Sequence, residues 1–179
     1  MPHPPLATYV SDHLAGASAG VALARRVARN GDGGRSGQTL AQIAHDVQAD
    51  FETLKRLAAH LGIGGSRVKN AGAWLSERAS RLKSNGRLRG DPRLQRLHEL
   101  ELLSLGIAGK QSLWQALQAA PDVSSAGFDL GALEARAVDQ REQVERERIA
   151  AARAALSPTP DDSAWLERHR RATTPHDAR

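Results

Sequence analysis

The amino-acid sequence predicts an all-α protein, a four-helix bundle with a long crossover between its second and third helices. Three observations lead to this prediction. Apolar residues recur at helical spacing in four segments of the 179-residue chain. Glycine and proline separate these segments. About 31 residues lie between the second and third segments, far more than a bundle with short loops needs.

The composition restricts which side chains can form the core and which cellular compartment suits the protein. Aromatic residues make up only 3% of the chain, so the core must consist mainly of aliphatic side chains. Cysteine is absent, which excludes disulfides and thiolate metal sites and favours a reducing compartment. The sequence has neither a signal-peptide pattern nor an apolar run long enough to span a membrane. We therefore expect a cytoplasmic protein with one domain.

The first helix is expected over residues 6–29, between two prolines and a glycine-rich stop signal. Its predicted inner face contains small and apolar residues and one histidine, namely Leu6, Val10, His13, Ala17, Gly20 and Ala24. Gly16 and Gly20 lie one turn apart on or beside this face. Glycine weakens a helix interior, so the pair predicts close approach of another backbone.

The second helix is expected over residues 39–61 and ends at Gly62. Its predicted inner face is strongly apolar and consists of Leu40, Ile43, Val47, Phe51, Leu54, Ala58 and Leu61. The third helix, residues 93–119, turns Leu97, Leu100, Leu103, Ile107 and Trp114 inward. The fourth, residues 130–156, presents Leu130, Leu133, Ala137, Val144, Ala151 and Ala155. These elements define one predicted domain, residues 1–156, followed by a polar tail over 157–179.

The crossover, residues 62–92, is predicted to contain a short basic helix over 68–84. Residues 67–89 hold seven Lys or Arg against one Glu. Trp74, Arg78 and Arg81 share one flank of this helix, with Lys83 close by, so the indole would stack on a guanidinium group. This flank is a candidate binding site for an anionic partner, and the partners that fit are a nucleic acid, an anionic membrane surface or an acidic protein. The alternative is that these cationic groups are merely solvated.

Common catalytic motifs are missing from the sequence. A di-iron or di-manganese carboxylate bundle needs Glu-x-x-His pairs, and none occurs. Gly106 to Lys110 resembles part of a phosphate-binding loop, but Ser104 stands where that motif requires glycine. Nucleophilic catalysis has no support, because there is neither a cysteine nor a G-x-S-x-G elbow.

Two interpretations of the inward-facing polar residues stay open. His13 with Asp50, or with Gln140, would form a buried polar contact that fixes the helix register, and we favour this interpretation. In the alternative, Asp12, His13, Asp50 and Glu101 would form a single metal site holding iron or manganese, with a reduced ligand set. The chain would then be a metal-binding protein or a metal-dependent oxidoreductase.

Three stretches carry a family resemblance: residues 9–17, residues 74–86 and residues 97–110. Together they resemble a family of uncharacterised bacterial ferritin-like four-helix bundles, over about residues 6–156. The resemblance implies the ferritin-like fold and implies no catalytic residues. We expect a non-enzymatic binding or interaction protein without a cofactor, with a homodimer as one arrangement.

Overall fold

The computed structural model describes residues 2–31, 33–63, 91–124 and 127–158, and all regular structure within these ranges is helical. Four long helices are present: α1 (Pro4–Arg29), α2 (Arg35–His60), α4 (Pro92–Gln118) and α6 (Leu130–Leu156). A short helix, α5 (Pro121–Ser124), follows α4 and was not predicted. The prediction of an all-α chain with four long helices is confirmed. The predicted helix of the crossover lies in residues 64–90, outside the described part.

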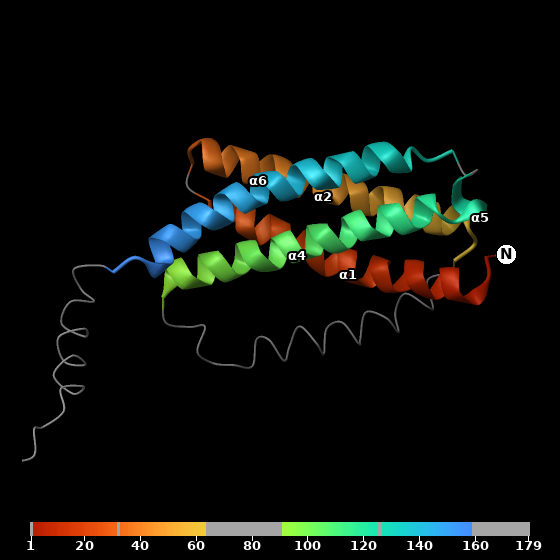
Figure 1. The fold of residues 1–179 in the computed structure, drawn as a ribbon, viewed down its shortest axis with the longest axis horizontal. Coiled ribbons are helices and arrows are strands. Elements are labelled where there is room, and N and C mark those ends of the chain that lie inside the picture. The colour runs from red at the N-terminus through yellow and green to blue at the C-terminus, as the bar shows by residue number, and fades with distance from the viewer. Residues whose placement is uncertain (1, 32, 64–90, 125–126, 159–179) are drawn as a thin grey trace, which may run out of the picture.

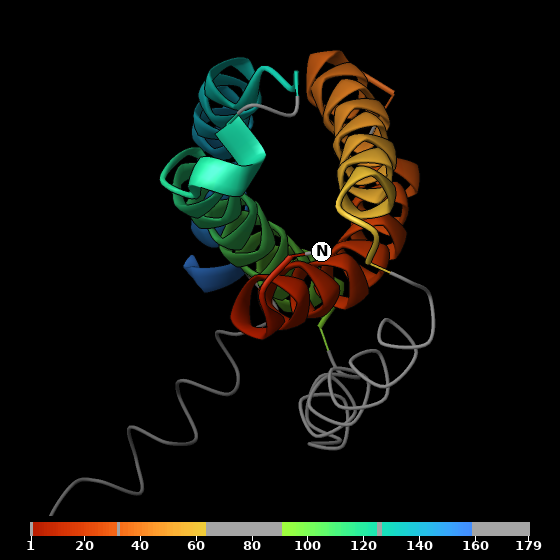
Figure 2. The same ribbon diagram turned by 90° about the vertical axis from the view of Figure 1, so that its right-hand side faces the viewer.

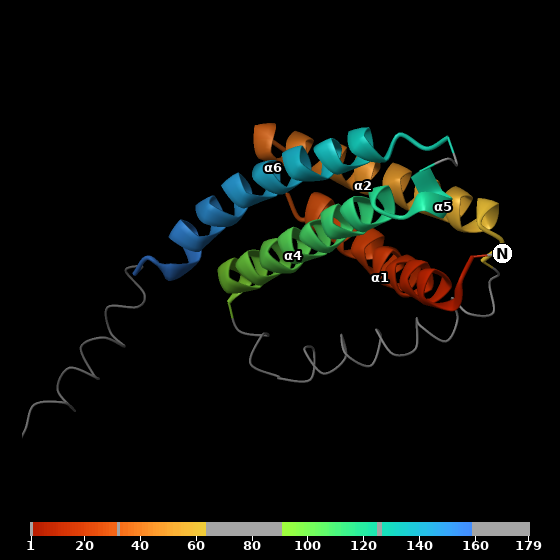
Figure 3. The ribbon, with the colours of Figure 1, turned by 45° about the vertical axis from the view of Figure 1, so that its right-hand side comes forward.

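The four long helices surround a common core (Figure 2). Antiparallel contacts join α1 to α2, α4 to α6 and α1 to α4, while α2 and α6 touch much less. Figure 1 shows α2 and α4 running in the same direction, and Figure 3 shows α4 and α6 side by side along the bundle. Because two parallel helices cannot be joined by a tight turn, the chain needs a long connection between α2 and α4.

Local sequence signals set several helix ends. Asp91 caps α4 by accepting a hydrogen bond from the backbone N–H of Arg93 at 2.8 Å, and Asp129 caps α6 in the same way from Ala132 at 2.9 Å. After α2, Gly62 adopts a positive φ of 71°, a conformation that favours glycine. The following residue, buried Ile63, then donates to the carbonyl of Ala58 at 2.9 Å.

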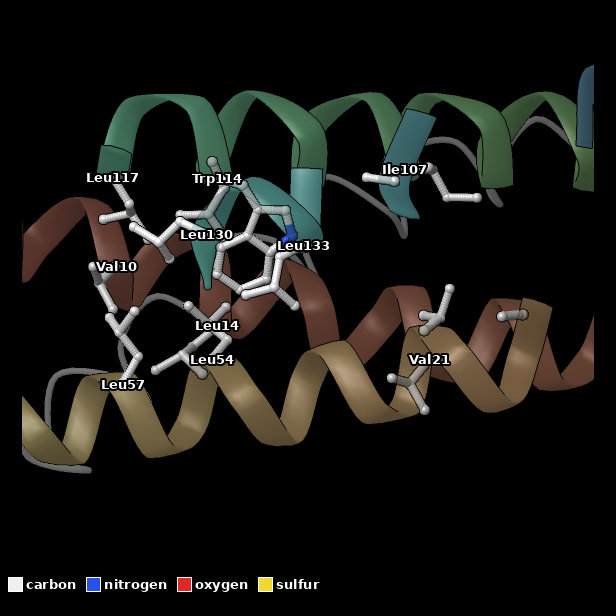
Figure 4. Close-up of a cluster of buried hydrophobic side chains, with 14 of the residues drawn as sticks. Val10, Leu14, Val21, Leu54, Leu57, Ile107, Trp114, Leu117, Leu130 and Leu133 are labelled. Atoms are coloured by element: carbon white, nitrogen blue, oxygen red, sulfur yellow. The ribbon is translucent and has the colours of Figure 1, made fainter. Parts of the chain in front are cut away.

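Among the described residues the core is aliphatic, as the composition predicted, with one large aromatic side chain, Trp114, buried in it. Figure 4 shows Trp114 among aliphatic side chains, with Leu54 and Leu133 close to it. The predicted inner face of α4 is confirmed, since Leu97, Leu100, Leu103, Ile107 and Trp114 are all buried. In α6, Leu130, Leu133, Ala137 and Val144 are buried, whereas Ala151 and Ala155 are only partly buried.

The predicted inner face of α1 is partly wrong. The structure buries Leu14 and Val21 and leaves His13 and Gly20 only partly covered. Ala7, Leu14 and Val21 recur every seven residues and are all buried. Burying Leu and Val removes more apolar surface from water than burying His and Gly, so the helix turns this row toward the core.

Candidate functional site

A pocket of about 420 Å³ opens between α1, α2 and α4. Its walls are mainly apolar and include Leu23, Val47, Phe51, Leu54, Leu102 and Ile107. Four glycines, Gly16, Gly20, Gly106 and Gly109, also line it. Such a space, apolar with few polar groups, is typical of small-molecule sites.

The glycines leave this pocket unfilled. A Cβ atom built on Gly20, Gly106 or Gly109 would meet nothing within 4 Å. The prediction that Gly20 permits close approach of another backbone is therefore wrong, because the space beside it is open. Gly106 and Gly109, from α4, line the same space. Any larger side chain at these positions would reduce its volume.

Trp114 is one of the residues that line the pocket, and its side chain is almost completely buried. The residue is 1% exposed, and its indole Nε1 has no hydrogen-bond partner. Buried indole N–H groups usually have an acceptor. Aliphatic packing around Trp114 does not explain why this donor has no acceptor.

A buried polar cluster adjoins the pocket and joins three helices. Lys110 of α4 donates to the carboxylate of Asp50 on α2 and to the side-chain oxygen of Gln140 on α6. Arg136 of α6 donates to the other Asp50 oxygen. Asp50 and Gln140 are each 1% exposed, while the Lys110 side chain is 14% exposed. Asp50 and Lys110 also line the pocket.

This cluster corrects the predicted polar contact. Asp50 and Gln140 are buried and share one network, but their common partner is Lys110 and not His13. Lys110 was missed because the phosphate-loop comparison treated it as part of a failed motif. One signal could have found it: Lys110 lies seven residues after Leu103 and seven before Leu117, both of which are buried.

Burial governs the protonation of Lys110. Removing the ammonium group from water lowers the pKa of Lys110 below its usual 10.5, and Arg136 acts in the same direction. The negative charges of Asp50 and Asp46 and the hydrogen bond to Asp50 oppose this shift. An ammonium group bound to a buried carboxylate forms a tight structural pair.

His13 lies at the edge of the pocket, beside Asp12. Its ring packs edge-on against Tyr9, with 4.6 Å between the ring centroids. Partial burial lowers the pKa of His13 below 6.5, against a smaller opposing effect of the Asp12 charge. The imidazole is therefore mainly uncharged at neutral pH.

The predicted metal ligands do not come together. Asp12, His13 and Asp50 line the same pocket, yet the described residues contain no group of three or more His, Cys, Asp or Glu able to hold a metal ion. Asp50 is bound by Lys110 and Arg136, and Glu101 pairs with Arg148 at 3.7 Å. These four side chains do not form the predicted iron or manganese site in this structure.

The predicted anion-binding residues Trp74, Arg78, Arg81 and Lys83 lie outside the described residues, as does the tail from 159 onward. Their roles stay predictions. Among the described helices, none is sufficiently long and apolar to span a membrane.

Comparisons with protein-family models, curated proteins and solved structures found no match for this chain. The resemblance to ferritin-like bundles stays a prediction, and the functional argument depends on the pocket alone.

Proposed function

We propose that this chain is a non-enzymatic binding protein that holds a small, mainly apolar ligand between α1, α2 and α4. One observation carries the proposal: Gly20, Gly106 and Gly109 line an apolar pocket, and a Cβ atom at each of them would meet nothing within 4 Å. Glycine costs about 1 kcal/mol relative to alanine in a helix interior. Three such glycines around one pocket indicate that the open space is retained although each glycine destabilises its helix.

The size and chemistry of the pocket support binding more than catalysis. Its volume of about 420 Å³ falls within the range of small-molecule sites, about 300–1,000 Å³. Of its charged groups, Asp50 and Lys110 bind each other. A general acid or base must be free to exchange a proton with a substrate. The Asp50 carboxylate is held by two cations, so it is not free to do this.

Titration with N-phenyl-1-naphthylamine, a neutral apolar dye that fluoresces when shielded from water, tests this function. We expect the full chain to bind about one dye molecule. Gly109→Leu and Gly20→Leu should each weaken dye binding at least about tenfold, since a leucine side chain occupies the space the dye needs. Circular dichroism would confirm that both variants remain helical.

Gly33→Leu is the matched control, because Gly33 is exposed, lies outside the pocket and also has open space around it. This variant should bind the dye like the wild type. Equal binding by all four proteins, or no saturable binding by the wild type, would refute the proposed function.

A further inference from the structure

We propose that the C-terminal segment of the chain, residues 159–179, packs back along α6 and covers an exposed apolar row on that helix. The row consists of Val138, Ile149 and Leu156. This inference goes beyond the proposed function and does not depend on the pocket between α1, α2 and α4. It follows from the composition and exposure of α6 and from the sequence that comes directly after the helix.

The last turns of α6 are apolar, yet none of their residues is buried. Residues 149–156 read Ile-Ala-Ala-Ala-Arg-Ala-Ala-Leu, and the last buried residue of the helix is Val144. Ala151 packs partly against the core, whereas Ile149 and Leu156, on the other side of the helix, are 39% and 70% exposed. A helix that is apolar all round is normally enclosed by other parts of a protein. Within the described residues, nothing covers this side of the helix end.

The exposed apolar side chains of α6 lie on a single face. At 3.6 residues per turn, Val138, Ile149 and Leu156 point within about 20° of one another. They make up three of the five large apolar side chains that are exposed among the described residues. A groove follows this row, and charged side chains such as Glu145 and Arg153 line it too. The groove thus offers both apolar contacts and charges to an occupant.

The chain continues from this end of α6 with a sequence suited to return along the helix. Ser157 ends α6 in an extended conformation, and proline occupies two of the next three positions. Asp161 and Asp162 follow, residues that are favoured at helix N-termini. Next come Trp165 and Leu166, the two large apolar side chains of residues 159–179. A connection this short commonly joins two antiparallel helices.

An antiparallel return brings suitable side chains together. With the turn centred on Thr159, Trp165 lies opposite Arg153, since the two residues are equally far from Thr159 along the chain. Leu166 then lies opposite the stretch between Ile149 and Arg153. An indole beside a guanidinium group and a leucine beside an isoleucine are both favourable contacts.

The charges favour this segment over a second copy of the chain. In the same register, Asp162 lies within one turn of Arg153, and Arg170 lies within one turn of Glu145. Two copies of α6 packed antiparallel through their ends would instead bring like charges together, because residues 146–153 hold three Arg against one Glu. The segment is also tethered to the helix end, so its local concentration there is high.

A nitroxide attached to Thr173→Cys measures where the segment lies, because the chain has no other cysteine. The nitroxide weakens the NMR signals of nearby backbone amides in the full chain labelled with ¹⁵N. If the segment returns along α6, residue 173 lies opposite Glu145, and we expect the largest loss of signal around Glu145. A segment without a fixed position would weaken the amides next to Leu156 most, since it is tethered there.

Two variants should release the segment. Trp165→Ala removes its largest apolar side chain, and Ile149→Asp places a charge in the row that it covers. In each variant we expect the largest loss of signal to move from Glu145 to Leu156. Leu105→Asp is the matched control, because Leu105 is 69% exposed on α4 and lies outside the groove. This control should keep the wild-type pattern.

A mixed sample identifies the occupant of the groove. It combines ¹⁵N-labelled chain without a nitroxide and unlabelled chain that carries one, and we expect no loss of signal along α6. Loss of signal around Glu145 in this sample would show that α6 contacts another copy, and it would overturn the proposal. A largest loss next to Leu156 in the singly labelled wild type, or an unchanged pattern in both release variants, would overturn it as well.

Discussion

Asp50 is an acid in an aliphatic interior, and its two partners explain why the fold tolerates it. Its carboxylate is almost completely buried and accepts from Lys110 on α4 and from Arg136 on α6. Burying an unpaired carboxylate would be very costly, whereas a paired one also fixes where three helices meet. The cluster therefore sets the position of α2 relative to α4 and α6, two helices that α2 otherwise contacts little.

Removing the Asp50 carboxylate should strongly destabilise the protein. Asp50→Ala leaves Lys110 buried without its carboxylate, and we expect a loss of about 3–5 kcal/mol in the free energy of unfolding. Urea denaturation measures this loss. Asp12→Ala is the control, since Asp12 is exposed at the rim of the pocket and should change stability by less than about 0.5 kcal/mol. Equal effects of the two variants would contradict the role given to the cluster.

His13 should make stability depend on pH. Its pKa is lowered in the folded state, so the unfolded chain, with a value near 6.5, binds more protons in the window just below that value. The free energy of unfolding should then rise with pH through this window and level off above it. His13→Gln should flatten this part of the profile measured by urea denaturation. Parallel profiles for the wild type and the variant would show that burial does not affect this imidazole.

At the scale of the helices, the sequence predicted where each helix begins and ends better than it predicted which face of the helix is buried. The ends of the four long helices lie within about four residues of the prediction, because proline, glycine and aspartate signals mark them. The inner face of α1 was misjudged, because the row through His13 and Gly20 was predicted to be buried. The row through Leu14 and Val21 is buried, since it places larger side chains in the core.

The sequence predicted only some of the residues of the candidate site. Asp50 and Gln140 were recognised as inward-facing, whereas Lys110 was not assigned to their network. Sequence periodicity places a residue on a face of its own helix, but it does not specify which faces of other helices lie opposite. Sequence periodicity does not predict the pocket either, because the pocket depends on the distances between α1, α2 and α4.

Two glycines, Gly20 in α1 and Gly31 in the turn that follows it, test how closely the chain is packed around each. Gly20→Ala should raise the free energy of unfolding by about 0.5–1 kcal/mol, because alanine is the better helix former and its Cβ meets nothing within 4 Å. Gly31→Ala should lower it, since that Cβ would lie 3.1 Å from the Gly37 Cα and 3.2 Å from the Ala28 oxygen. Thermal and urea denaturation of both variants would check the opposite signs. A loss of stability in Gly20→Ala would mean that α1 is closely packed there.

At the scale of the whole molecule, the bundle has one cluster of buried apolar side chains and, beside it, a pocket between α1, α2 and α4. Trp114 lies in this cluster among aliphatic side chains (Figure 4). Further along α1 and α4, glycines replace larger side chains and the pocket opens. Since α2 joins α6 through few contacts, the position of α2 depends largely on α1 and on the Asp50 cluster.

Xenon binding in a crystal tests this arrangement most directly, because xenon enters apolar cavities without needing any particular functional group. We expect xenon density in the wild-type crystal between Gly20, Gly109 and Phe51, and loss of that density in Gly109→Leu. Side chains of α1, α2 and α4 packed together at this place, with no xenon between them, would contradict the existence of the pocket.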